Sequence, residues 1–291
     1  MTTTISSLAR EMEAQLTPAL GSDARPAARN LICDRLGLSF TAYATRLPEP
    51  VSEADEAALR EWAKRVADGE PVQYVTGEGP FGGFSLHVES GVLIPRPETE
   101  GLVERIISWA DGRTDLRAID LGTGSGCIAI ALARGLVAAE VMAVDASDDA
   151  IRIAQGNADR LAPEADIFKV DLLSSEADDM ADDCGPFDIV VSNPPYIRQS
   201  ERKDMAANVL DHEPEMALFV PDADPLLFYR RIGQLCIDGL LDPDGGALFF
   251  EINEALGHET AEMLRGLGFA QVSVEKDYLG KDRYVIARIN N

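Results

Sequence analysis

The amino-acid sequence predicts an α/β protein with a doubly wound sheet of seven strands and a small helical region before it. From about residue 115 onward, short apolar runs alternate with stretches of helical periodicity, the pattern of a mostly parallel sheet covered by helices. A glycine-rich turn joins the first of these runs to the next helix. The last two runs are separated only by the short "DYLGKD" turn. We therefore expect these last two strands to pair antiparallel with each other at the sheet edge.

The first 70 or so residues are expected to form a helical domain. In "SEADEAALREWAKRVADGEP", Ser52 can cap a helix with an acidic first turn, and apolar side chains recur at helical spacing until Gly69 and Pro71 end it. Downstream, "GEGPFGGFSLHV" mixes turn formers with aromatic and β-branched residues, which predicts a β-hairpin linker. The predicted boundaries are residues 1–70, 71–97 and 98–291.

Seven apolar runs supply the predicted strands, and helical patterns lie between them. In chain order the strands are "LRAIDLG", "EVMAVDA", "ADIFKV", "FDIVVSN", "GALFFEI", "AQVSVEK" and "RYVIARI". Helices are expected near residues 98–110, 126–135, 148–160, 224–239 and 254–266. The acidic stretch "SSEADDMADDCG", from Ser174 to Gly185, is interpreted as a solvated loop.

The charge of the chain argues against some classes of function. Fifty acidic and 26 basic residues give a net charge of −24, which repels a phosphate backbone and disfavours nucleic acid as the main substrate. No segment approaches the roughly 20 apolar residues that span a bilayer, and the N-terminus lacks the pattern of a secretory signal, so a cytoplasmic location without membrane attachment is expected. The four cysteines and three histidines are scattered, so we expect no disulfide framework and no metal site.

A glycine-rich loop, "IDLGTGSGCIAIALA", places Gly122, Gly124 and Gly126 between the first strand and a helix. Glycines allow the backbone to turn sharply and approach a ligand, and a helix N-terminus offers free N–H groups. The spacing is G-x-G-x-G, whereas dinucleotide-binding loops have G-x-G-x-x-G. Taken alone, the loop is either a ligand-binding turn or only a tight connection.

Two carboxylates indicate which ligand the loop receives. Asp145 ends the second strand, where an acid can accept hydrogen bonds from two ribose hydroxyls; its alternative role as a helix cap can be filled by Ser147 or Asp148. Asp120 precedes the loop and can accept from backbone amides or meet an ammonium group. Both acids favour a cationic, hydroxyl-rich ligand over a pyrophosphate. S-adenosylmethionine has these properties, because it carries a ribose, an ammonium and a sulfonium and has no phosphate.

The segment "VSNPPYIRQS" predicts a site for a planar NH₂ group. Asn193 follows the fourth strand, at the edge where open α/β sheets bind ligands. Pro194 and Pro195 fix two φ angles and remove two donors, which leaves carbonyl acceptors, and Tyr196 offers a flat face for stacking. Acceptors on both hydrogens of a conjugated nitrogen can align its lone pair with a sulfonium methyl, so no strong base is needed. The alternative is a strand that ends in a Pro-Pro turn with a core tyrosine.

Together with "PVQYVTGEGPFGGFSLHVESGVLIPRPETE" upstream, these motifs resemble the HemK/PrmC family of protein-glutamine N5-methyltransferases, which modify peptide chain release factors. The resemblance covers nearly the whole chain and is strongest from about residue 71 to 290. Asn-Pro-Pro-Tyr also occurs in adenine and some RNA methyltransferases, so "LIPRPETE", from Leu93 to Glu100, is more discriminating. The family implies a Rossmann-like class I methyltransferase sheet whose last strand is antiparallel.

The resemblance also implies a role for individual residues. The glycine loop and Asp145 are expected to bind S-adenosylmethionine, the pair after the third strand to flank its adenine, and residues 1–70 to recognise the release factor. The expected cofactor-binding residues are Asp120, Gly122, Thr123, Gly124, Ser125, Gly126, Asp145, Asp171, Leu172 and Asn193. The residues expected to be catalytic and to hold the glutamine amide of a Gly-Gly-Gln loop are Asn193, Pro194, Pro195 and Tyr196.

Some positions depart from the family pattern or leave their role open. Leu172 stands where some relatives carry an aromatic residue, and Asn253 follows "FFEI" where the family often has glycine. Arg96 and Glu98 are expected to form an ion pair that fixes the linker over the cofactor site; the alternative is a solvated pair that contributes little. Glu213 is either a carboxylate behind the site or a loop anchor.

Two other functions compete with glutamine methylation. Transfer to the amino group of adenine or guanine in a nucleic acid would need a basic recognition surface, which the net charge disfavours. A non-catalytic partner of translation factors that binds S-adenosylmethionine would not need Asn193 and Tyr196. The sequence leaves the oligomeric state open, and a monomer is the expectation.

Overall fold

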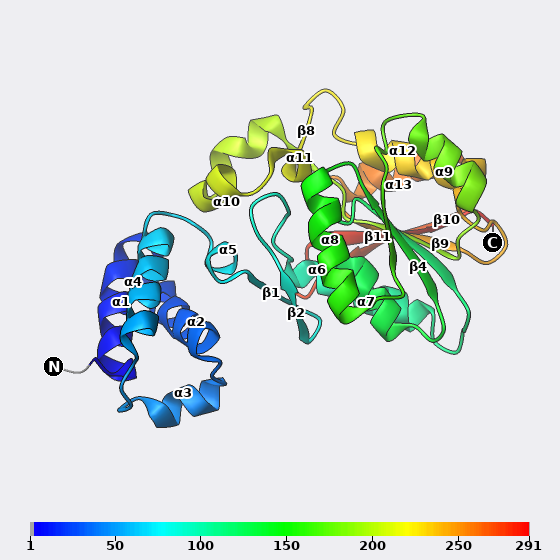
Figure 1. Cartoon of the computed structure of the whole chain (residues 1–291). Coiled ribbons are helices and arrows are strands. Elements are labelled where there is room, and N and C mark those ends of the chain that lie inside the picture. Colours follow the sequence, from blue (N-terminus) through cyan, green and yellow to red (C-terminus); the bar gives the residue numbers. More distant parts are fainter. Residues whose placement is uncertain (1–2, 291) are drawn as a thin grey trace. The chain divides into compact units, whose positions relative to one another are not determined.

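The computed structural model describes residues 3–290, and the chain divides into two compact units (Figure 1). One unit comprises the chain up to Glu78 together with Ala206–His212. The other comprises Gly79–Met205 and the chain from Glu213 onward. Each unit has a hydrophobic core of its own.

The first unit is helical. Its apolar side chains, among them Leu8, Leu31 and Leu59, are fully buried in one core. Ser52 caps α4 as predicted, because its hydroxyl accepts from the backbone N–H of Asp55 at 3.1 Å. The helices are α1 (Ile5–Leu20), the 3₁₀ turn Gly21–Asp23, α2 (Ala24–Leu36), α3 (Phe40–Arg46), α4 (Glu53–Ala67), α5 (Val72–Thr76) and α10 (Ala207–His212).

A β-hairpin opens the second unit. Its strands are β1 (Glu78–Phe81) and β2 (Phe84–His87), so the predicted hairpin is present, although the short helix α5 precedes it within the same stretch. Asn157 of α8 (Asp148–Leu161) ties the hairpin to the glycine loop. The side-chain Oδ1 of Asn157 accepts from the backbone N–H of His87 at 2.7 Å, and its Nδ2 donates to the carbonyls of His87 at 2.9 Å and Ser125 at 3.0 Å.

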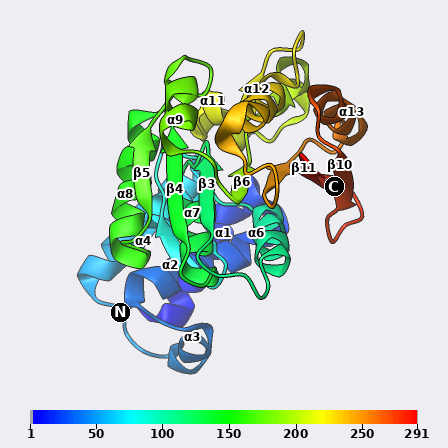
Figure 2. The same ribbon diagram turned by 90° about the vertical axis from the view of Figure 1, so that its right-hand side faces the viewer.

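The second unit is built on a sheet of seven strands, the number that the sequence predicted, and their order is β10-β11-β9-β6-β3-β4-β5. Figure 2 shows β5, β4, β3 and β6 side by side. Strands β5, β4, β3, β6 and β9 run parallel, and β11 pairs antiparallel with both β9 and β10. The strands are β3 (Arg117–Leu121), β4 (Glu140–Asp145), β5 (Asp166–Lys169), β6 (Ile189–Ser192), β9 (Ala247–Glu251), β10 (Gln271–Lys276) and β11 (Asp282–Arg288).

Helices cover both faces of this sheet, which is why its central strands are mostly apolar and are buried. Every residue of β6 and β9 is buried. Helices α6 (Pro97–Trp109), α7 (Cys127–Gly135) and α8 pack side by side, and α12 (Leu227–Leu235), continued by the π-helical turn Cys236–Leu240, packs beside α9 (Glu176–Cys184) and α13 (Gly257–Leu267) (Figure 1). Within residues 3–290, no helix is both long and apolar enough to cross a membrane.

Helix α9 corrects one prediction. The acidic stretch from Ser174 to Gly185 was expected to be a solvated loop, but most of it is helical. Ala177, Met180 and Ala181 are buried at helical spacing, and they form a narrow apolar stripe among many acids. The shorter elements of this unit are β7 (Ile197–Arg198), which pairs parallel with β8 (Phe219–Val220), the 3₁₀ turn Gln199–Asp204, and α11 (Glu215–Leu218).

Candidate active site

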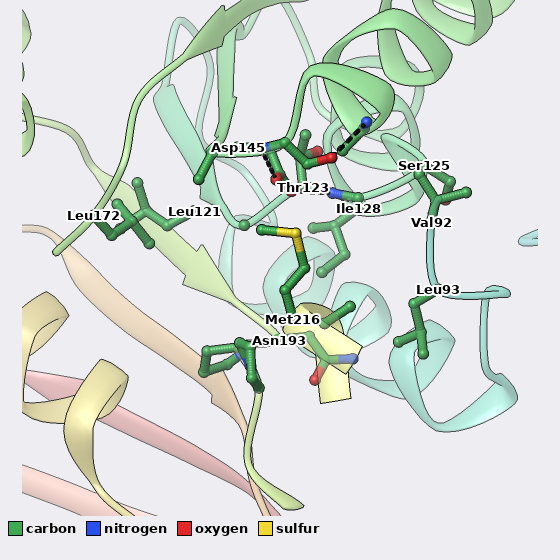
Figure 3. Close-up of a pocket in the computed structure, with 18 of the residues that line it drawn as sticks. Val92, Leu93, Leu121, Thr123, Ser125, Ile128, Asp145, Leu172, Asn193 and Met216 are labelled. Atoms are coloured by element: carbon green, nitrogen blue, oxygen red, sulfur yellow. Dashed lines mark hydrogen bonds between the residues drawn. The ribbon is translucent and has the colours of Figure 1, made fainter. Parts of the chain in front are cut away.

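A cavity of about 290 Å³ lies at the carboxyl ends of the parallel strands in the second unit (Figure 3). The chain builds β3, β4 and β5 in one direction and then returns to place β6 on the other side of β3, so the strand order reverses between β3 and β6. Open α/β sheets bind ligands at such a point. The predicted residues that line the cavity are Gly122, Thr123, Gly124, Ser125, Asp145, Asp171, Leu172, Asn193, Pro194 and Pro195.

The three glycines of the loop after β3 have different tasks. Gly122 and Gly124 line the cavity, and their φ angles of 80° and 57° lie in the region that favours glycine. Gly126 does not line it. A Cβ at Gly126 would lie 3.2 Å from Ile130 Cδ1 and 3.3 Å from Ala154 Cβ, so this glycine allows α7 and α8 to approach each other.

Backbone N–H groups hold the carboxylate of Asp145 and leave some of its oxygen lone pairs unused. Its Oδ2 accepts from the N–H of Gly124 and its Oδ1 from the N–H of Ser147, both at 2.9 Å. Burial raises the pKa of Asp145, and these backbone donors oppose the shift. Ser147 caps α8 by accepting from the N–H of Ala150 at 3.3 Å. Asp145 is therefore available to accept hydrogen bonds from a ligand in the cavity.

Asp120 lies beneath the glycine loop and does not line the cavity. It is fully buried, and its Oδ2 accepts from Thr123 Oγ1 at 2.6 Å and from the N–H of Ala129 at 3.3 Å. Its Oδ1 has no hydrogen-bond partner within residues 3–290. Burial raises the pKa of Asp120 to about 7. The carboxylate supports the loop, and its second oxygen remains available to a cationic group.

The Asn-Pro-Pro-Tyr segment is divided between the cavity and the core. Asn193, Pro194 and Pro195 line the cavity, whereas Tyr196 does not. The half-buried ring of Tyr196 packs against the sheet core, and its hydroxyl donates to Glu251 Oε1 at 3.3 Å. Burial, and then the nearby Glu251, raise the pKa of Tyr196 above its ordinary value. A stacking role for Tyr196 stays a prediction.

Residues 92–96 form another wall of the cavity, which Glu213 anchors. The carboxylate of Glu213 accepts from the Arg96 guanidinium at 2.5 Å and from the N–H of Ile94 at 3.2 Å. The predicted ion pair between Arg96 and Glu98 is therefore wrong. Of the two roles considered for Glu213, the contacts match that of a loop anchor, because Glu213 holds residues 94 and 96 of this wall. Its partners lie more than a hundred residues away in the chain, so no local pattern indicates the pairing.

Sequence reasoning missed several lining residues. Ile128 of α7 and Phe228 of α12 add apolar surface to that of Leu172. Met216 of α11 is 56% exposed and also lines the cavity; in the view of Figure 3 it lies between Asp145 and Asn193. Single apolar residues on helices carry no signal that separates a cavity wall from a core.

The lining fits S-adenosylmethionine. Asp145 supplies a hydroxyl acceptor, the apolar walls suit a planar base, and the glycine loop admits close approach of the backbone. Among the described lining residues, Arg96 is the one cationic side chain, and Glu213 neutralises it. The cavity therefore offers little attraction to a phosphate.

Comparisons with known proteins agree with this geometry. Residues 7–77 match the family model "PrmC N-terminal domain", and residues 99–218 match "Methyltransferase small domain". A curated protein of Flavobacterium psychrophilum named "Release factor glutamine methyltransferase" is 43% identical over 242 residues, which cover 81% of this chain and 82% of that protein. A protein of the same name from Bacteroides thetaiotaomicron is 42% identical over 258 residues, with 88% and 90% covered.

Solved structures support the fold alone. The hMettl16 catalytic domain in complex with MAT2A 3′UTR hairpin 6 superposes with a TM-score of 0.55 at 17% identity, covering 82% of this chain and 83% of that one. The human methyltransferase 10 domain containing protein gives a TM-score of 0.52 at 19% identity, with 72% and 90% covered. The family models and the two curated relatives show more than the fold: the chain belongs to the release factor glutamine methyltransferase family and uses S-adenosylmethionine.

Proposed function

We propose that this protein transfers a methyl group from S-adenosylmethionine to the side-chain amide nitrogen, N5, of the glutamine in the Gly-Gly-Gln motif of peptide chain release factors. One observation carries the proposal. A single cavity in a chain of this family brings together the acceptor carboxylate of Asp145 and the amide of Asn193 beside its two prolines. The first suits the ribose of the cofactor, and the second suits the NH₂ group that receives the methyl.

The residues around Asn193 can prepare a weak nucleophile. A glutamine amide nitrogen attacks poorly because its lone pair is conjugated with the carbonyl. The Asn193 side-chain oxygen and the carbonyls of the Pro-Pro turn can accept from both amide hydrogens, and this orients the lone pair for in-line attack. When bound, the cofactor supplies a methyl group on a sulfonium, whose leaving group is a neutral thioether.

Proton removal needs no strong base at this site. The amide nitrogen becomes acidic only as it gains the methyl group, so its proton can leave for water afterwards. None of the described lining residues is a histidine. The cavity therefore has to orient the cofactor and the glutamine amide and to exclude other orientations of the amide. The rigid backbone of the two prolines suits this task.

We place the protein in the cytoplasm as a monomer, with the release factor as its partner and without nucleic acid or membrane as a binding surface. Release factors act on ribosomes, which supports the location. We assign recognition of the release factor to the helical unit that contains residues 7–77.

Separate incubations with two candidate substrates test the proposal against the rival functions. The protein is incubated with S-adenosylmethionine labelled in its methyl group, and with either a release factor or RNA. We expect label in the release factor. Label in RNA alone would show a nucleic-acid amine methyltransferase, and no transfer despite cofactor binding would indicate a non-catalytic partner. The net charge of −24 disfavours the outcome with label in RNA alone.

A further inference from the structure

A buried chain of hydrogen bonds connects the substrate loop to the sheet. The Nδ2 of Asn193 donates to Thr99 Oγ1 at 3.2 Å, and Thr99 Oγ1 donates to Glu251 Oε2 at 2.7 Å. Thr99 lies in the first turn of α6 and is 2% exposed; Glu251 is the last residue of β9 and is 1% exposed. The hydroxyl of Thr99 therefore links two segments that are far apart in the sequence, the loop that carries Asn193 and the end of β9.

Elementary chemistry sets the direction of this chain. A hydroxyl carries a single hydrogen, and an ionised carboxylate can only accept. The hydrogen of Thr99 is committed to Glu251, so the hydroxyl presents only lone pairs to Asn193. The atom of Asn193 that faces Thr99 must then be its NH₂ group. The other atom of the amide, Oδ1, is left to serve the cavity as an acceptor.

We propose that Thr99 and Glu251 are positioning residues, which hold Asn193 so that its Oδ1, and not its NH₂, meets the nitrogen that receives the methyl group. The proposal rests on the proposed function, because it names the orientation that this function needs. A reversed amide would place a donor against the donor NH₂ of glutamine and lose one of the two acceptors.

Glu251 is itself held in place from several elements. The hydroxyl of Tyr196 donates to its Oε1 at 3.3 Å, which gives this tyrosine a task behind the cavity. The hydroxyl of Tyr229 donates to the Glu251 backbone carbonyl at 3.2 Å. The titratable groups that act electrostatically on Glu251 or respond to it are Glu98, Cys127, Tyr196, Tyr229, Arg283 and Tyr284.

This arrangement makes the orientation of Asn193 sensitive to pH. Burial raises the pKa of Glu251 to about 7, while Thr99, Arg283 and Tyr196 act in the opposite direction. Once protonated, the carboxyl group can donate to Thr99, and the Thr99 hydrogen is then free to turn toward Asn193. We therefore expect kcat to fall as the pH drops below about 7. Glu251→Gln should lower kcat several-fold and should remove this decrease of kcat at low pH.

Removal of the Thr99 hydroxyl tests the proposal most sharply. Thr99→Val keeps the branched shape, and we expect it to lower kcat by about 10-fold or more, with little change in the Kd of S-adenosylmethionine. Thr99→Ser should restore most of kcat. The matched control is Thr260→Val, because Thr260 of α13 is buried and its hydroxyl has no partner within residues 3–290. It should retain wild-type kcat.

A second readout separates this proposal from the proposed function. The side-chain amide signals of Asn193 in an NMR spectrum, assigned with Asn193→Asp, should move in Thr99→Val and stay in place in Thr260→Val. If they move while the wild type fails to methylate a release factor, the function is wrong and the positioning stands. If the signals do not move, or if Thr99→Val methylates at the wild-type rate, the positioning proposal is overturned.

Discussion

We assign Asn193 the most direct role in the proposed chemistry, because it lines the cavity and its amide nitrogen donates to Thr99 behind it. We predict that Asn193→Ala lowers kcat for release-factor methylation by ~10²–10³, the effect of removing one preorganised polar group from a transition-state site. Single-turnover kinetics provide the measurement. The far-UV circular dichroism spectrum should be unchanged, because the side chain belongs to a loop. A variant with near-normal rates would contradict the assignment.

Asp145 should act on binding rather than on turnover. Removing its carboxylate in Asp145→Ala takes away the acceptor for ribose hydroxyls, and we expect the Kd of S-adenosylmethionine to rise by about 10-fold or more. Asp145→Asn retains one acceptor oxygen and should show a smaller rise. Isothermal calorimetry measures both. An unchanged Kd in the alanine variant would remove Asp145 from the ribose role.

Asp120 should make stability depend on pH. Its folded-state pKa of about 7 lies above that of an unfolded aspartate, so its contribution to stability is present at low pH and is lost as the pH rises toward and through 7. Asp120→Asn does not titrate. Between pH 5 and pH 8, the free energy of unfolding of the wild type should fall relative to the variant by roughly 2–3 kcal/mol. Urea unfolding without cofactor measures this; parallel pH profiles would refute the assignment.

At the scale of elements, Asn157 joins three parts of the second unit. Its buried amide makes hydrogen bonds to the backbone of His87 and Ser125. We predict that Asn157→Ala lowers the free energy of unfolding by at least about 2 kcal/mol, because it leaves buried backbone groups unpaired. The matched control is the exposed Gln155 on the same helix, where Gln155→Ala should change stability by less than about 0.5 kcal/mol. Equal effects would show that the amide is not the link.

The strands could be predicted from the sequence because each contains a short apolar or β-branched stretch, and the central strands β6 and β9 are buried at every position. Helix α9 was missed because only three buried residues mark its inner face among many acids. The glycine loop, Asp145 and Asn193 could be placed at one sheet edge, because carboxyl ends of neighbouring parallel strands meet there. Thr99, Glu213 and Glu251 could not be paired with their partners, since each contact joins distant segments.

Asn253 shows how a departure from the family pattern is accommodated. At this position the family resemblance led us to expect glycine. The Nδ2 of Asn253 donates to the carbonyl of Tyr196 at 3.3 Å, and its Oδ1 accepts from the N–H of Ala255 at 3.0 Å. The larger side chain thus supports the loop that carries Asn193. The sequence alone did not reveal this effect, because the contact depends on where β9 ends relative to β6.

At the scale of the whole molecule, charge and cavity favour the same class of substrate. A net charge of −24 disfavours a nucleic acid, and the cavity offers a neutralised arginine and acceptor groups for an NH₂. A protein glutamine meets both conditions.

The most direct test is mass spectrometry of the release-factor peptide that contains the Gly-Gly-Gln motif, after incubation of the release factor with this protein and S-adenosylmethionine. We predict that the glutamine of this motif gains the mass of one methylene, and that fragmentation places it on the side chain. A parallel incubation with Asn193→Ala should give little or no gain. An unmodified glutamine in the presence of active, cofactor-binding protein, or a methyl group on another residue, would contradict the account.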